Sequence, residues 1–160
     1  MHVPFESQPK SARVWIYQAD RALNDQECQL IEQNALAFCE QWAAHGVALR
    51  SSFKILHQRF LVLAVDEQAN MASGCSIDAS VGFVRSIEQN LNINLLDRTK
   101  VAFIVNDEVF VESFTNLKSK VQHGEITENT LTFNNLVTNV GEFEENWLVT
   151  AGNSWLKKYF

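Results

Sequence analysis

The chain has 160 residues, of which 46% are hydrophobic and 20% are charged, and nineteen acidic against thirteen basic residues give a formal net charge of −6. This composition excludes a disordered protein and supplies enough apolar material for one well-packed domain. The acidic excess also argues against nucleic-acid binding, which depends on clustered Lys and Arg.

The three cysteines, Cys28, Cys39 and Cys75, form no CxxC pair and no cysteine-histidine pattern with metal-ligand spacing. We therefore predict no metal site and no cofactor, and we expect reduced cysteines in a cytoplasmic protein. The first residues, MHVPFESQPKSAR, lack the apolar core of a signal peptide. No run approaches the roughly eighteen apolar residues of a membrane span.

We predict a single domain over residues 1–160, with a loose N-terminal arm over residues 1–11. The first regular element is a strand, RVWIYQ, at residues 13–18, which is rich in β-branched and aromatic residues.

A long amphipathic helix is predicted over residues 25–44, where apolar residues recur at helical spacing. Asn24, followed three residues later by Glu27, fits a capping box that satisfies free backbone N–H groups at the helix start. Gly46 is the expected stop signal.

Two apolar runs at residues 47–56 and 59–65 follow, and we predict that they form a hairpin. The second run is almost wholly apolar, which indicates a central strand covered on both faces. A second helix over residues 77–91 and a strand over residues 100–105 complete the order strand, helix, strand, strand, helix, strand. That order predicts an α+β fold with a split βαβ, ferredoxin-like sheet packed by two helices.

The last third of the chain predicts a C-terminal extension of strands and helices. Asn139 with Glu142 fits another capping box, which would open a helix over residues 140–151. The other expected elements are a strand in EVFVESF, a short helix in LKSKVQH, a strand in NTLTF and a helical turn in SWLKKYF. The apolar side chains of this part should pack on the first unit or on another subunit, namely Phe143, Trp147, Trp155 and Phe160.

The segment SGCSIDASV, residues 73–81, is the first candidate for chemistry. A helix start carries free N–H groups and partial positive charge, which can stabilise a thiolate or hold an anion. On this interpretation Cys75 is a nucleophile, while the small residues Ser73, Gly74 and Ser76 form an anion-binding turn and Asp78 lies beside them.

The alternative interpretation is an ordinary helix start, with Ser76 or Asp78 as the N-cap and Cys75 as a small buried residue. A nucleophile needs a base within hydrogen-bond reach. His45, His57 and His123 are the candidate bases beyond the N-terminal His2.

Charged and amide residues at the ends of predicted strands are further candidates. Asp66 and Glu67 end the third strand, and Arg21, which follows the first strand, has the fork geometry that grips carboxylate or phosphate. Solvent exposure and pairing with a local acid explain these charges without a ligand. Turn chemistry likewise explains Asn134 and Asn135.

Taken together, RVWIYQADR, RFLVLAVDE, SGCSID and NNLVTNVGEFEENWLVTAGNSWLKKYF resemble a family of small bacterial proteins that often carry the label ABC transporter ATPase. The resemblance implies a bacterial, cytoplasmic protein, and the label implies ATP binding. The sequence has no GxxxxGK[ST] phosphate loop and no LSGGQ-like segment, so no nucleotide-binding residue can be assigned. It also has no GxGxxG, HExxH or GxSxG motif.

The favoured interpretation is a small module that binds a small molecule or a protein, with its ligand site between the sheet and the C-terminal helices. Its apolar tail makes a homodimer plausible. A thiol-dependent enzyme using Cys75 is the second hypothesis, and an ATP-binding protein is the third.

Overall fold

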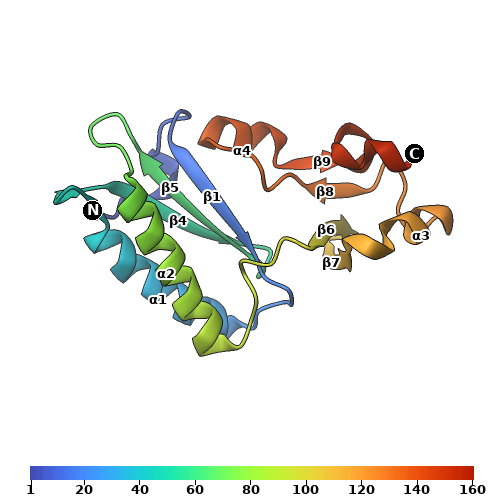
Figure 1. Cartoon of the computed structure of the whole chain (residues 1–160), viewed down its shortest axis with the longest axis horizontal. Coiled ribbons are helices and arrows are strands. Elements are labelled where there is room, and N and C mark those ends of the chain that lie inside the picture. The colour runs from blue at the N-terminus through green and yellow to red at the C-terminus, as the bar shows by residue number, and fades with distance from the viewer.

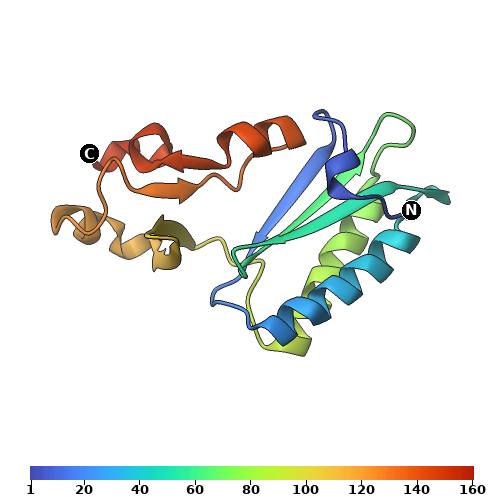
Figure 2. The ribbon, with the colours of Figure 1, turned by 180° about the vertical axis from the view of Figure 1, so that it is seen from behind.

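The computed structural model describes residues 1–160 and shows a mixed α/β protein with four α-helices and several antiparallel sheets (Figures 1 and 2). The elements of the first part are η1 (Phe5–Ser7), β1 (Arg13–Gln18), α1 (Asp25–Gln41), β2 (Ala43–Ala44), β3 (Val47–Ala48), β4 (Arg50–Leu56), β5 (Phe60–Asp66) and α2 (Gly74–Leu91). The elements of the second part, called the C-terminal part below, are β6 (Lys100–Val105), β7 (Glu108–Ser113), η2 (Phe114–Asn116), α3 (Leu117–Gln122), β8 (Leu131–Phe133), α4 (Val140–Asn146), β9 (Leu148–Thr150), η3 (Ala151–Asn153) and η4 (Trp155–Tyr159).

The first sheet has the order β1-β5-β4, and β5 runs antiparallel to both neighbours. Val14 of β1 and Ser52 of β4 both pair with Ala64 of β5. Consequently β1 and β4 are parallel to each other, and α1 connects them across β5, which makes one split βαβ unit. Residues 60–65 are all buried, so the prediction of a central strand covered on both faces is confirmed.

Alternating side chains of β5 enter two different cores. Two helices, α1 and α2, cover one face of the sheet (Figure 1). Leu63 packs on that face in one cluster with Ile31 of α1 and Val84 of α2. Val62 points to the opposite face and packs in a cluster with Phe143 from the C-terminal part of the chain. The C-terminal part therefore covers the second face of the first sheet.

The second main sheet has the order β7-β6-β8-β9, with every neighbouring pair antiparallel. In a complete ferredoxin-like sheet, residues 100–105 would lie beside β1. They pair instead with β7 and β8, which follow them in the chain, so the ferredoxin-like arrangement is not confirmed. The free edge of β1 is met by a loop: the Val14 N–H donates to the Thr138 carbonyl at 3.0 Å.

Residues 1–11, expected to form a loose arm, pack on the first sheet. The Val3 N–H donates to the Ser51 carbonyl at 2.8 Å, which extends the free edge of β4. Phe5 is buried, and its ring meets Phe143 edge-on at a centroid distance of 5.9 Å. An unpaired strand edge and a nearby apolar cluster thus hold the arm in place.

Two predicted helices are shorter than expected. The capping box of Asn24 and Glu27 is confirmed, but α1 ends at Gln41 because the small β2–β3 hairpin follows. The hairpin turns at His45 and Gly46, which both have positive φ. Similarly, α4 begins after the predicted cap at Asn139 but ends at Asn146, because β9 continues the second sheet beside β8.

None of the helices combines the length and apolar character that crossing a bilayer requires.

Candidate ligand-binding site

The segment SGCSIDASV begins α2, with Ser73 as its N-cap. Ser73 Oγ accepts from the Ser76 N–H at 3.1 Å, and Ser76 Oγ accepts from the Ser73 N–H at 2.7 Å. Both hydroxyls are therefore used by a reciprocal capping box. The expectation that Ser76 or Asp78 is the N-cap is wrong, because the helix begins earlier, at Gly74.

Cys75 is exposed, so the expectation of a buried cysteine at a helix start is also wrong. Gly74 and Asp78 are exposed beside it. No hydrogen bond joins the Cys75 thiol to a histidine or a carboxylate. His57, one of the candidate bases, packs instead against Phe133 and Trp147, on the face of the first sheet opposite α2.

Arg21 forms a two-pronged ion pair with Glu27, with N–O distances of 2.9 and 2.7 Å. It also donates to the carbonyl of Leu91, the last residue of α2, at 2.9 Å. Hydrogen bonds from Arg21 and from the Asn24 N–H lower the pKa of Glu27 to about 2. Arg21 is thus occupied by a local acid.

Asp66 is likewise engaged near its own strand end. It accepts from the Gln68 N–H at 3.1 Å and lies 3.7 Å from Arg50 Nε. Arg21 and Cys75 lie at opposite ends of α2, whose eighteen residues span about 27 Å. The structure does not bring the residues proposed from sequence together in one site.

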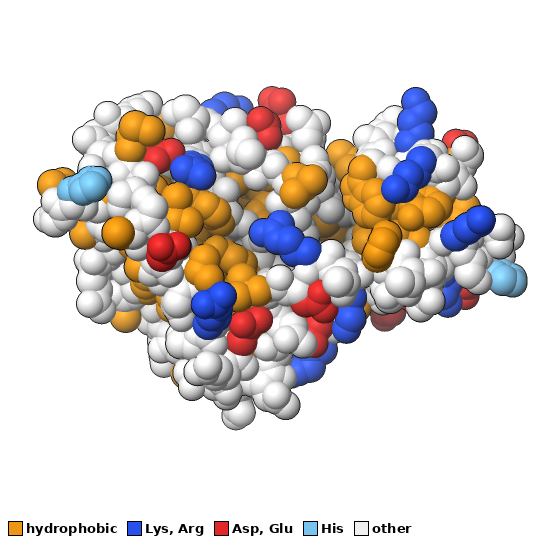
Figure 3. Space-filling model, in the orientation of Figure 1, with side chains coloured by type: hydrophobic (Ala, Val, Ile, Leu, Met, Phe, Trp, Pro, Cys, Tyr) orange, Lys and Arg blue, Asp and Glu red, His pale blue; other side chains and the backbone are white.

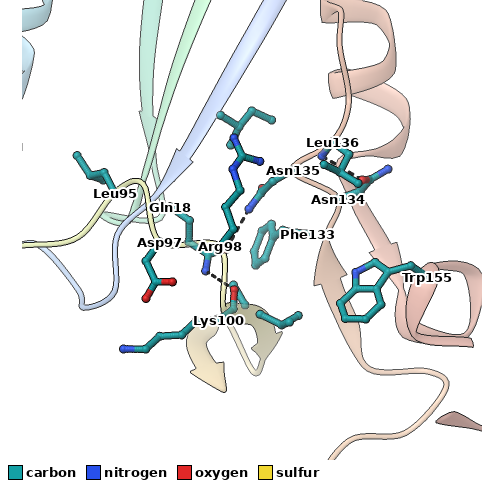
Figure 4. Close-up of a pocket in the computed structure, with 13 residues that line it drawn as sticks. Gln18, Leu95, Asp97, Arg98, Lys100, Phe133, Asn134, Asn135, Leu136 and Trp155 are labelled. Atoms are coloured by element: carbon teal, nitrogen blue, oxygen red, sulfur yellow. Dashed lines mark hydrogen bonds between the residues drawn. The ribbon is translucent and has the colours of Figure 1, made fainter. Parts of the chain in front are cut away.

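A cavity of about 220 Å³ opens where β1, the segment before β6 and the C-terminal part meet (Figure 4). We call it the junction cavity. It is lined by Ile16, Gln18, Leu95, Asp97, Arg98, Lys100, Val101, Ala102, Phe133, Asn134, Asn135, Leu136 and Trp155.

A chain of side-chain amides crosses this cavity. The Trp147 indole N–H donates to Asn135 Oδ1 at 2.9 Å, and Asn135 Nδ2 donates to Gln18 Oε1 at 3.0 Å. Gln18 Nε2 then donates to the Lys100 carbonyl at 3.2 Å. An indole N–H can only donate and a carbonyl can only accept, so the two ends of the chain set the orientation of both amides.

In this orientation the amide oxygens of Asn135 and Gln18 accept from other side chains of the series, and some of the amide N–H groups stay free. Gln18 and Asn135 each use one of two amide N–H groups, and one remains on each. Asn134 Oδ1 accepts from the Leu136 N–H at 3.2 Å, so its amide nitrogen is also free to donate. The amides that line the cavity therefore offer mainly hydrogen-bond donors.

The charged residues that line the cavity, Asp97, Arg98 and Lys100, carry a net positive charge. Arg98 is exposed and takes part in none of the ion pairs of the structure. In Figure 4 its side chain extends past Asn135, whereas Lys100 turns toward Asp97. Hydrogen bonds from Thr99 and then the charge of Lys100 lower the pKa of Asp97. Of the two cations that line the cavity, Arg98 is therefore the one without a nearby acidic partner.

Two aromatic rings complete the wall. Phe133 is buried, whereas Trp155 is 48% exposed and lies across from Arg98 (Figure 4). Lys158 Nζ lies 5.4 Å from the centre of a Trp155 ring. Figure 3 shows an apolar patch with Lys and Arg side chains around it at the end of the molecule that carries the C-terminus. The ring can stack with a flat or apolar group, and the donors and positive charge beside it suit an anionic group.

Sequence reasoning did not single out Arg98, Gln18 or Trp155 for a site, and it assigned Asn135 to turn chemistry. These residues come from four separate segments and form no motif. The one available signal was two neighbouring asparagines after a strand, of which only Asn134 has a turn-like hydrogen bond.

No cluster of three or more His, Cys, Asp or Glu side chains is arranged to hold a metal ion. No protein-family model, curated protein or solved structure matches the chain.

Proposed function

We propose that this protein is a binding module that holds a small organic anion in the junction cavity. The observation that carries the proposal is the set of free donors at one opening: the unpaired guanidinium of Arg98 and the free amide N–H groups of Gln18 and Asn135. A carboxylate or phosphate offers only acceptors and would satisfy them.

Electrostatics supports an anion at this place although the whole chain has a net charge of −6. A hydrogen bond to a charged group contributes about 1.5–3 kcal/mol, and solvent exposure favours the lower value. We therefore expect Arg98 to contribute about tenfold in affinity. The ring of Trp155 favours an anion with a flat or apolar body over a bare inorganic ion.

The test is calorimetric titration of the protein with benzoate and with benzamide, which has the same shape without the charge. We expect benzoate to bind and benzamide to bind at least about tenfold more weakly. Inorganic phosphate and ATP, titrated in parallel, show whether the site prefers a carboxylate, a phosphate or a nucleotide.

The matched variants are Arg98→Gln and Arg85→Gln, because Arg85 is an exposed arginine on α2 that does not line the cavity. Arg98→Gln should weaken benzoate about tenfold, and Arg85→Gln should leave it unchanged. Absence of binding by every anion, or equal weakening in both variants, would refute the proposal.

A further inference from the structure

A second hollow of about 460 Å³ adjoins the junction cavity. The two share a wall of four residues: Phe133, Asn134, Leu136 and Trp155. Leu136 is 71% exposed and Trp155 is 48% exposed, so neither is covered by the chain at the boundary. A ligand held in the junction cavity can therefore continue past these two side chains into the second hollow.

The second hollow has the opposite electrostatic character. Glu142 is its only charged lining residue, and no Lys or Arg lines it. The Glu142 carboxylate accepts from the Thr138 N–H at 3.2 Å and from Asn139 Nδ2 at 3.3 Å, which leaves further acceptor capacity on both oxygens. Asn146 and Asn153 also line the hollow, and both are exposed.

We infer that the ligand is an elongated zwitterionic acid, with its anionic group at Arg98 and an amine at Glu142. This inference rests on the proposed function and extends it. The carboxylate end meets free donors and an unpaired guanidinium, and the amine end meets the Glu142 carboxylate beside the amide side chains of Asn146 and Asn153. The middle of the ligand lies against Trp155 and Leu136, so it is flat or apolar.

The experiment compares two ligands of matched shape, para-(aminomethyl)benzoate and para-ethylbenzoate, by calorimetry on the full chain. Longer aminoalkyl homologues and their alkyl counterparts increase the distance between the carboxylate and the other end of the ligand. Because an exposed ion pair contributes little, we expect at least one amine-bearing ligand to bind about three- to fivefold more tightly than its alkyl counterpart.

Glu142→Gln should abolish this preference while leaving the affinity for benzoate unchanged. Glu144→Gln is the matched control, because Glu144 is on the same helix, pairs with Lys10 and does not line the hollow. Asn146→Leu is a second variant that leaves the α4 cap intact, and it should reduce the same preference.

If benzoate binds through Arg98 but no amine-bearing ligand is preferred, the inference is overturned and the proposed function stands. A preference that persists in both Glu142→Gln and Asn146→Leu also overturns it. If no anion binds at all, the inference and the proposed function both fail.

Discussion

The Trp147 indole N–H donates to Asn135 Oδ1 at 2.9 Å, and this contact joins the C-cap residue of α4 to the loop that follows β8. Trp147 is buried against Phe60 of the first sheet, with ring centroids 5.0 Å apart. The same hydrogen bond orients the amides of Asn135 and Gln18 at the junction cavity. One buried donor thus links the packing of the C-terminal part to the chemistry of the candidate site.

A double-mutant cycle with Trp147→Phe and Asn135→Ala measures this link. We expect a coupling of about 0.5–1.5 kcal/mol in the free energy of unfolding, the usual net contribution of one hydrogen bond. Urea unfolding of the wild type, both single variants and the double variant gives the value. Strictly additive losses would show that the contact does not stabilise the fold.

Truncation of Phe60 should destabilise the fold strongly, because its side chain is fully buried between the first sheet and the C-terminal part. We expect Phe60→Ala to cost about 3–5 kcal/mol in the free energy of unfolding. Phe114→Ala is the control, because Phe114 is 50% exposed and should cost less than about 1 kcal/mol. Similar losses for both variants in urea unfolding would contradict the described packing.

Glu27 should make the stability depend on pH in the acid range. Its pKa is about 2 in the folded state against an ordinary value of 4.5, mainly because of Arg21. A lowered folded pKa gives stability that is present above pH 4.5 and is lost as the pH falls toward 2. The effect is modest, because the Arg21 side chain is 44% exposed.

The measurement is urea unfolding of the wild type and Glu27→Gln at several pH values. The stability difference between them should be largest above pH 4.5 and should shrink as the pH falls toward 2. Glu32→Gln, an exposed change on the same helix, is the control and should show no such trend. A difference that stays constant from pH 6 to pH 3 would contradict the assigned ion pair.

The three cysteines should react with iodoacetamide in a definite order in the native protein at pH 8. Cys75 is exposed and should react first. Burial and nearby acids raise the pKa of Cys28, and burial raises the pKa of Cys39 to about 11, so Cys39 should react only on unfolding. Peptide mass spectrometry separates the three sites, and early modification of Cys39 would contradict its burial.

Local rules predicted much of the fold. The apolar run at residues 60–65, the capping box at Asn24 and the N-cap at Asn139 lie where local sequence indicates, because each depends only on neighbouring residues. The second half of the predicted box at Asn139 is absent, because the Glu142 carboxylate accepts from the Thr138 N–H. The N-cap at Ser73 was missed because its partner three residues on is Ser76, where a capping box usually has Glu or Gln.

Long-range pairing was not predictable in the same way. Ala102 and Phe103 in β6 are both buried, which fits a central strand in either sheet. Its actual partners, β7 and β8, follow it in the chain, so strand order alone favoured the wrong neighbour. The candidate site depends on this pairing, because it brings Arg98 and Asn135 to one opening.

The most direct test of the proposed anion site uses the four tryptophans. Their indole N–H signals are followed by nuclear magnetic resonance while benzoate is added, and single Trp→Phe variants assign them. Trp155 lines the junction cavity, whereas the Trp42 N–H donates to the Ser76 carbonyl in the helix-covered core. We expect the Trp155 signal to shift most, Trp147 less, and Trp42 and Trp15 hardly at all. Arg98→Gln should raise the benzoate concentration at half-maximal shift about tenfold. Equal shifts at Trp42 and Trp155, or no shift at Trp155 at saturating benzoate, would contradict an anion site in this cavity.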